Sequence, residues 1–213
     1  MAGLPAAVTH APLRTFRPQD LAGVYTQPGV QLHRLTRQGR VRRAAHGYYY
    51  AVPDDQDPTW TPGIEAVAAG IATAVFGDRV PVLMHLTAAR MHGALPRAVG
   101  VAIVATPGQH APVRVDLGRP ATVVFVARDV DRLDAVLVNT DLGPALATTV
   151  EQTVLDLAKR PGLGGMPDEA LAVVRALLPR CDDERLTGLA RDQRMTRVLD
   201  RLRHTATTAA PGV

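Results

Sequence analysis

Several residue types are scarce in this chain, and each scarcity excludes a class of protein. The single cysteine, Cys181, cannot form an intrachain disulfide or a multi-cysteine zinc site, which fits a reducing compartment. No apolar run approaches the roughly 20 residues that a membrane-spanning helix needs, and the N-terminus lacks the charged start and apolar stretch of a secretion signal. We therefore expect a cytoplasmic protein with no membrane partner.

Lysine is also scarce, because Lys159 is the only one and arginine supplies almost all of the positive charge. Residues 1–53 contain seven arginines and one acid, Asp20, a local net charge of +6. Since the whole chain carries +4, the remainder carries about −2. A basic block joined to a near-neutral body indicates two parts with different functions, and the basic part is suited to nucleic-acid phosphates.

The length and the apolar content allow one large or two small domains, since the chain has 213 residues of which 46% are hydrophobic. An acidic connector bounded by prolines, residues 53–58, is the natural boundary. The sequence thus predicts an N-terminal domain over residues 1–56 and a C-terminal domain over residues 60–205. The fold class we expect is α+β.

The N-terminal pattern is typical of a winged helix-turn-helix. Its expected elements are a helix over 18–25 starting at a proline, a break at 26–29, a helical pattern over 30–39 ending at a glycine, and strands over 41–44 and 48–52 around a turn at His46-Gly47. In the second helix, Val30, Leu32 and Leu35 are expected to be buried. The three tyrosines 48–50 fit strand packing better than base stacking, because alternation turns at least one of them inward.

The C-terminal part predicts a mixed α/β domain with a small sheet and a helical C-terminal segment. Thr87 is expected to cap a short helix, and Thr149 with Gln152 has the spacing of a capping box. The expected helices cover 64–76, 87–92, a segment from 149, 168–178, 182–191 and 194–203, and the expected strands cover 80–84, 99–105, 113–117, 121–127 and 136–139.

The candidate DNA-binding residues lie in and around the second helix and the hairpin. In a helix-turn-helix the second helix enters the major groove, so its outward side chains contact base edges, and the helix end and wing meet the phosphates. A solvated basic face is the competing interpretation, but no acid is interspersed to pair with these arginines. The candidates are Gln27, Gln31, Arg34, Arg37, Gln38, Arg40, Arg42, Arg43 and His46, with Gln31, Arg34 and Gln38 as base-contacting residues and His46 at the wing tip.

Three segments resemble one family when taken in order. LHRLTRQGRVRRAAHGYYYAVP (32–53) resembles the end of the winged helix of AbiEi-type antitoxins, from type IV toxin–antitoxin systems. MHLTAARMHGALP (84–96) and ATTVEQTVLDLAKRP (147–161) resemble two helix motifs of the same family. The chain departs from the pattern at Gln152, where an arginine is expected, and Pro5 and Pro12 interrupt the expected first helix.

The resemblance implies a repressor of its own operon. Its winged helix would bind inverted repeats in the promoter, as a dimer or cooperatively, and its C-terminal domain would counter a cognate nucleotidyltransferase-like toxin. Double-stranded DNA and that toxin are therefore the expected partners.

We expect no enzyme, cofactor or metal site. Asp156 and Lys159 lie three positions apart in a predicted helix, unlike a nuclease core, which places its acid and lysine two apart on a strand. His85 and His92 lack nearby cysteines or paired carboxylates and are expected to be packing residues, as Asp156 is expected to be a cap or a buried hydrogen-bonding group. Two alternatives stay open: a ligand-responsive winged-helix regulator without a toxin partner, and a nuclease.

Overall fold

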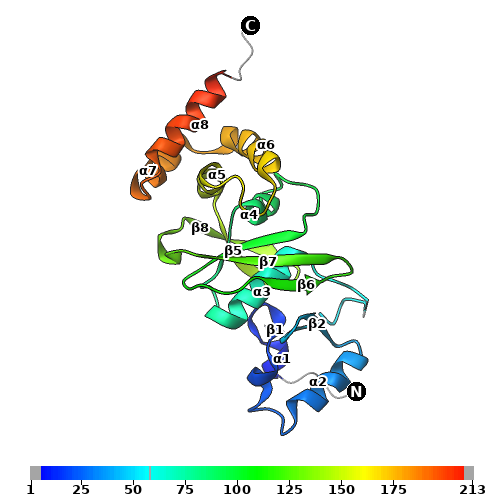
Figure 1. The fold of residues 1–213 in the computed structure, drawn as a ribbon. Coiled ribbons are helices and arrows are strands. Elements are labelled where there is room, and N and C mark those ends of the chain that lie inside the picture. Colours follow the sequence, from blue (N-terminus) through cyan, green and yellow to red (C-terminus); the bar gives the residue numbers. More distant parts are fainter. Residues whose placement is uncertain (1–5, 58, 209–213) are drawn as a thin grey trace.

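The computed structural model describes residues 6–57 and 59–208. Their strands form a single mixed sheet of nine strands in the order β1-β3-β2-β6-β7-β5-β4-β9-β8. Figure 1 shows the small N-terminal elements at one end of the molecule and the helices α5 to α8 at the other. The molecule is therefore α+β, as the sequence predicts.

The N-terminal part holds short elements around a compact core. These are α1 (Ala6–Thr9), the 3₁₀ turns η1 (Pro12–Arg14) and η2 (Pro18–Leu21), α2 (Pro28–Arg37), and strands β1 (Thr15–Phe16), β2 (Val41–Ala45) and β3 (Tyr48–Ala51). α2 ends at Arg37, and two residues later Gly39 has a φ of +70°, a conformation that glycine adopts at little cost. The hairpin turn at His46-Gly47 lies where the sequence predicts it.

Two N-terminal expectations are wrong. The helix expected over 18–25 is only the 3₁₀ turn η2, which ends at Leu21. Val30 is 61% exposed rather than buried, because α2 begins at Pro28 and turns Leu32 and Leu35, but not Val30, toward the core.

The body is a sheet covered on both faces by helices (Figure 1). α3 packs against one face and α4 with α5 against the other, while α6, α7 and α8 pack around α5. The strands are β4 (Val82–Leu83), β5 (Val101–Thr106), β6 (Val113–Asp116), β7 (Pro120–Ala127), β8 (Ala135–Thr140) and β9 (Gly143–Thr148). The helices are α3 (Ile64–Phe76), α4 (Leu86–Met91), η3 (Val130–Arg132), α5 (Val150–Lys159), α6 (Pro167–Leu177), η4 (Leu178–Arg180), α7 (Asp183–Asp192) and α8 (Thr196–Thr208).

Of the two expected helix caps in the body, the one at Thr87 is wrong and the one at Thr149 is confirmed. Residue 85, not Thr87, is the cap of α4, and the Thr87 hydroxyl instead accepts a hydrogen bond from the Ile103 amide at 2.6 Å. Thr149 does cap α5, accepting from the Gln152 amide at 3.3 Å. The Gln152 carboxamide, however, contacts Asp156 and Gln193 rather than completing a capping box.

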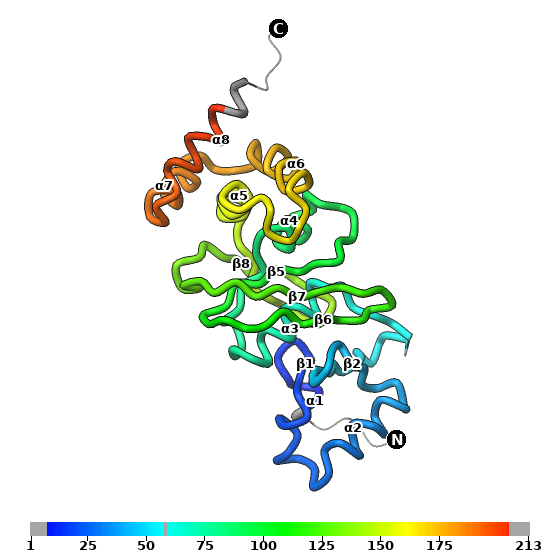
Figure 2. The backbone as a smooth tube through the Cα atoms, in the orientation of Figure 1, coloured from blue at the N-terminus to red at the C-terminus, as the bar shows by residue number. Residues whose placement is uncertain are grey.

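The two parts of the chain share one sheet, and Figure 2 shows them directly adjoining. β2 pairs with β6 at Ala45 and Val115, across the predicted domain boundary. Thr15 of β1 packs on Gly70 of α3 so closely that a Cβ at position 70 would collide with the Thr15 hydroxyl. Tyr50 lies in the body's main hydrophobic cluster, so the N-terminal part is anchored on the body through buried contacts.

Candidate functional site

The solvent face of α2 carries polar and basic side chains above a small apolar core. Leu32 and Leu35 are 4% and 3% exposed and pack in a cluster with Phe16, Leu21 and Val41. On the other side of the helix, Arg34, Arg37 and Gln38 are exposed and Gln31 is half-buried. α2 therefore separates an inner apolar face from an outer face without acids.

Two candidate base-contacting residues are joined on this outer face. Arg34 donates from Nε to Oε1 of Gln31 at 3.0 Å, one helical turn apart. This bond leaves the two terminal amino groups of Arg34 as donors. Gln27 is exposed immediately before the helix, at its N-cap position, so it extends the same row toward the N-terminus of α2.

The hairpin adds a second basic element beside α2. Arg43 is exposed and donates from Nε to the Ala45 carbonyl at 3.2 Å, and its Nη2 lies 2.9 Å from Nδ1 of His46. The guanidinium of Arg40 lies 4.0 Å from the exposed carboxylate of Asp54. Such an exposed and distant pair contributes little free energy.

A hollow between α2 and β2 brings several of the candidates together. Its lining consists of Thr36, Arg37, Gln38, Gly39, Arg42 and Arg43. Arg42 differs from its neighbours, since its Nη1 donates to the carbonyls of Thr59 and Trp60 at 2.7 and 2.8 Å. Arg42 thus holds the connector against the hairpin. Arg37 and Arg43, in contrast, are exposed.

The three tyrosines pack, as expected from strand alternation. Tyr50 is 2% exposed and meets the Trp60 ring edge-on at 6.4 Å, and burial raises its pKa, with Arg42 opposing. Tyr49 stacks on Phe16 with ring centroids 6.3 Å apart. Tyr49 thus packs on the core beneath α2, whereas Tyr48 and Tyr50 pack on the body's main hydrophobic cluster.

Asp156 is the centre of a buried polar group in the body. Its carboxylate is 1% exposed and accepts at Oδ1 from Arg128 at 3.1 Å and from Gln152 at 3.2 Å, while Oδ2 has no hydrogen-bond partner among the described residues. Burial raises the pKa of Asp156, and Arg128 opposes that rise. The expected role of Asp156 as a buried hydrogen-bonding group is confirmed, and Gln152 contacts it directly.

Arg128 is a partner that the sequence interpretation missed. It lies 28 positions before Asp156, so no local spacing connects them. The sequence feature that could have indicated Arg128 is its position directly after the last residue of β7, since strand ends often position functional side chains at the edge of a sheet.

His85 and His92 both serve the packing of α4. His85 is fully buried and its Nε2 donates to the Arg160 carbonyl at 3.1 Å, while His92 donates to the Thr148 carbonyl at 2.7 Å. Burial lowers the pKa of His85 to about 4, against the opposing effect of that hydrogen bond. His85 therefore ties α4 to the end of α5, and His92 ties it to the end of β9. The described residues contain no group of three potential metal ligands.

Comparison with known proteins then identifies the body. The model of the AbiEi antitoxin C-terminal domain matches residues 81–205, more than half of the chain. The chain belongs to the AbiEi antitoxin family. It is therefore an antitoxin of a toxin–antitoxin system, and an antitoxin has a toxin partner. AbiEi antitoxins are not a known enzyme family.

A solved structure agrees on the fold. The crystal structure of the RV2827C protein from Mycobacterium tuberculosis is similar with a TM-score of 0.53 at 20% identity, covering 95% of this AbiEi antitoxin and 79% of that chain. At this identity the likeness concerns the fold alone. No curated protein matches the chain. Within the described residues, every helix is too short or too polar to cross a bilayer.

Proposed function

We propose that this AbiEi antitoxin is a winged-helix repressor of its own toxin–antitoxin operon. Residues 1–56 would bind double-stranded DNA in the cytoplasm, and residues 60–205 would counter a cognate nucleotidyltransferase-like toxin. The observation that carries the proposal is the acid-free outer face of α2, lying beside a basic hairpin on a small apolar core.

In this proposal α2 enters the major groove by its N-terminal turns. Gln31 and Arg34 are one turn apart and hydrogen-bonded, which positions an amide and a guanidinium together for base edges. Gln27 and Gln38 extend the contacts along the helix. Glutamine suits adenine and arginine suits guanine, because each can form two parallel hydrogen bonds with that base.

The hairpin and the end of α2 would hold the DNA backbone. Arg37, Arg40 and Arg43 supply the charges for phosphates, which position the protein without selecting a sequence. His46, at the exposed turn and beside Arg43, is suited to the minor groove. Arg42 contributes differently: it stabilises the hairpin through the connector.

Inverted repeats in the promoter would bind two copies, since the symmetry of the DNA site matches a pair of identical proteins. The toxin would bind elsewhere, on the AbiEi domain. The genomic neighbourhood bears on this part of the proposal, because a nucleotidyltransferase-like gene is expected directly beside this one.

A salt series of DNA binding tests the repressor function. Binding to the DNA immediately upstream of the gene and to unrelated DNA of equal length would be measured by fluorescence anisotropy. We expect tighter binding to the upstream DNA and a steep decline with salt, because each phosphate contact releases a counterion. Equal affinity for both DNAs at all salt concentrations would contradict sequence-specific repression.

A further inference from the structure

A second basic site lies in the AbiEi domain, apart from the DNA-binding candidates. A hollow of about 350 Å³ is formed by η3, the end of α5 and the loop between α7 and α8. Arg128, Arg132, Lys159 and Arg194 line it, against two carboxylates, Asp129 and Asp192. Figure 1 places α5 and α7 at the end of the molecule opposite to α2.

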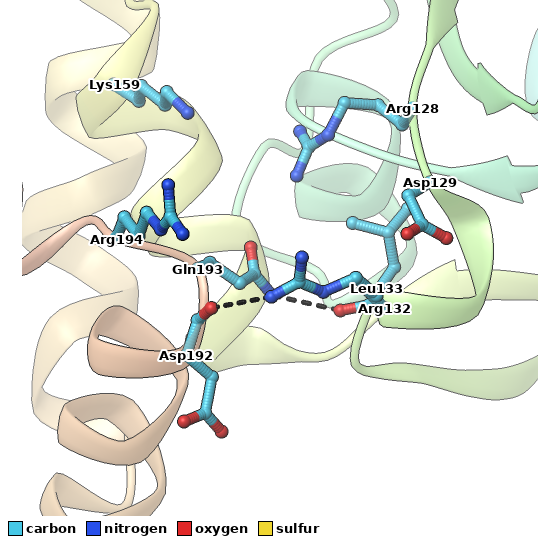
Figure 3. A pocket seen from close by; sticks show the side chains of 8 residues that line it. All are labelled: Arg128, Asp129, Arg132, Leu133, Lys159, Asp192, Gln193 and Arg194. Atoms are coloured by element: carbon cyan, nitrogen blue, oxygen red, sulfur yellow. Dashed lines mark hydrogen bonds between the residues drawn. The ribbon is translucent and has the colours of Figure 1, made fainter.

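Three cationic groups converge on this hollow (Figure 3). Arg128, Lys159 and Arg194 come from three different segments and extend toward a shared space, whereas the Asp192 carboxylate points away. Among the described residues, the side chains of Lys159 and Arg194 make no hydrogen bond or ion pair. Asp156 lies 3.1 Å from Arg128 and also interacts electrostatically with Lys159, and Asp129 and Asp192 lie in the lining. These acids offset only part of the charge of the four cationic side chains.

Hydrogen bonds fix the walls of the hollow. Arg132 donates to the Asp192 carbonyl at 2.8 Å, and Gln193 donates to the Arg132 carbonyl at 3.2 Å, as the dashed lines in Figure 3 show. Gln193 also bonds to Gln152, which donates to Asp156 at 3.2 Å. The α7–α8 loop is thus tied through α5 to the same buried carboxylate that binds Arg128.

The backbone at Arg194 points to a role for its side chain. Its φ is +56°, in the left-handed region, at the position after α7 where glycine or asparagine would be unstrained. An arginine here carries a conformational cost, and its guanidinium is directed into the hollow (Figure 3).

We propose that this hollow binds the phosphate groups of a small molecule. A tetrahedral phosphate carries up to two charges and accepts hydrogen bonds from several sides, which matches three cations arriving from different directions. A lone carboxylate matches the three cations less well, because it is planar and carries only one charge. The volume of about 350 Å³ lies at the lower end for small-molecule sites. The lining holds no aromatic ring to stack a base, so the phosphates themselves are the recognised group.

This site goes beyond the proposed repressor function, because it uses none of the DNA-binding candidates. Calorimetric titration of the full chain with inorganic pyrophosphate, without added metal, tests it. We expect one site per chain and no measurable binding of acetate at the same concentration. Lys159→Gln and Arg194→Gln should each weaken pyrophosphate binding about tenfold, since each removes a charged hydrogen-bond donor. Arg175→Gln, on the exposed side of α6, is the matched control and should bind as the unmodified chain does.

Titrations with ATP and AMP identify the kind of molecule that supplies the phosphate. ATP binding at the same site with AMP much weaker would indicate a nucleotide polyphosphate, and pyrophosphate alone would indicate the free anion; both support the proposal. Arg194→Asn, which suits the left-handed backbone, replaces Arg194→Gln if the latter lowers the melting temperature.

Three outcomes would overturn the proposal. The first is no heat of binding with pyrophosphate, and the second is equal weakening in Arg175→Gln. The third is competition between upstream duplex DNA and pyrophosphate, together with a loss of DNA affinity in Lys159→Gln as large as the loss of pyrophosphate affinity. The hollow would then belong to a nucleic-acid surface.

Discussion

Charged residues are used differently at the two ends of this AbiEi antitoxin. Around α2, Arg34, Arg37 and Arg43 are exposed, and the segment that holds them offers no acid. In the body, acids are paired with arginines, as in Arg128–Asp156, Arg90–Glu65 and Arg185–Asp134. The N-terminal charges are therefore exposed to a partner, while these three arginines of the body are held in ion pairs within the fold.

Because the two groups of arginines differ in this way, we expect substitutions near α2 to affect binding and substitutions in the body to affect stability. Removing an exposed arginine beside α2 should reduce binding and leave the free energy of unfolding unchanged. Removing an arginine that neutralises a buried carboxylate should lower the free energy of unfolding, because the remaining charge has no solvent to stabilise it.

Arg128→Ala should give the largest effect on stability. Asp156 is 1% exposed and would lose its cationic partner, at a cost of about 3 kcal/mol in the free energy of unfolding at pH 7. Urea denaturation measures this loss. The double variant Arg128→Ala/Asp156→Asn should recover part of it, since the buried charge is then removed as well. Unchanged stability in Arg128→Ala would show that Asp156 is neutral at pH 7.

His85 should make stability depend on pH. Burial lowers its pKa from 6.5 to about 4, so the unfolded chain binds a proton before the folded chain does as pH falls. The contribution of neutral His85 to the free energy of unfolding is complete above about pH 6.5. It is lost as the pH falls from 6.5 to 4, and the loss amounts to at most about 3 kcal/mol. Urea denaturation across this range should give a shallower pH dependence for His85→Gln than for the unmodified chain. Parallel curves would exclude His85 as the titrating group.

The arginines near α2 should separate base recognition from phosphate binding. Arg34→Ala should lose about 1 to 3 kcal/mol on the upstream DNA and relax sequence preference, whereas Arg43→Ala should weaken all DNA alike. Arg42→Ala is the matched comparison: it should lower the melting temperature more and DNA affinity less, because Arg42 is bonded to the connector. Equal losses on every DNA from Arg34→Ala would contradict the base-contacting role of Arg34.

Arg185→Ala should give the smallest effect. Burial raises the pKa of Asp134, but hydrogen bonds from Arg185 and Thr149 outweigh this and lower it. Since Arg185 is 49% exposed, solvent can replace it, and the loss should be below about 1 kcal/mol in urea denaturation. A loss as large as that of Arg128→Ala would remove the distinction between exposed and buried pairs.

Local patterns predicted most elements of the fold. α3 matches its expected bounds because a long, alanine-rich and mostly apolar run has few alternatives to a buried helix. β9 was missed, since its sequence GPALAT contains glycine, proline and alanine, which disfavour strands; its pairing with β8 and β4 is what makes it a strand. The β2–β6 pairing was not predictable either, because β3, the connector, α3, β4, α4 and β5 separate the two strands along the chain.

The candidate site was predictable from the sequence only where it depends on local spacing. The outward positions of Arg34 and Arg37 follow from helical spacing against Leu32 and Leu35. The attachment of Arg42 to the connector depends on a tertiary contact 17 to 18 positions away, which spacing does not reveal. The basic hollow of the AbiEi domain unites three distant segments and carries no local motif.

The most direct test of this division is a triple variant, Arg34→Gln/Arg37→Gln/Arg43→Gln, assayed for two activities. We predict at least about 100-fold weaker binding to the upstream DNA, an unchanged melting temperature, and full neutralisation of the proposed cognate toxin on co-expression. Promoter binding within about threefold of the unmodified chain would contradict the account, as would a folded variant that fails to neutralise the toxin.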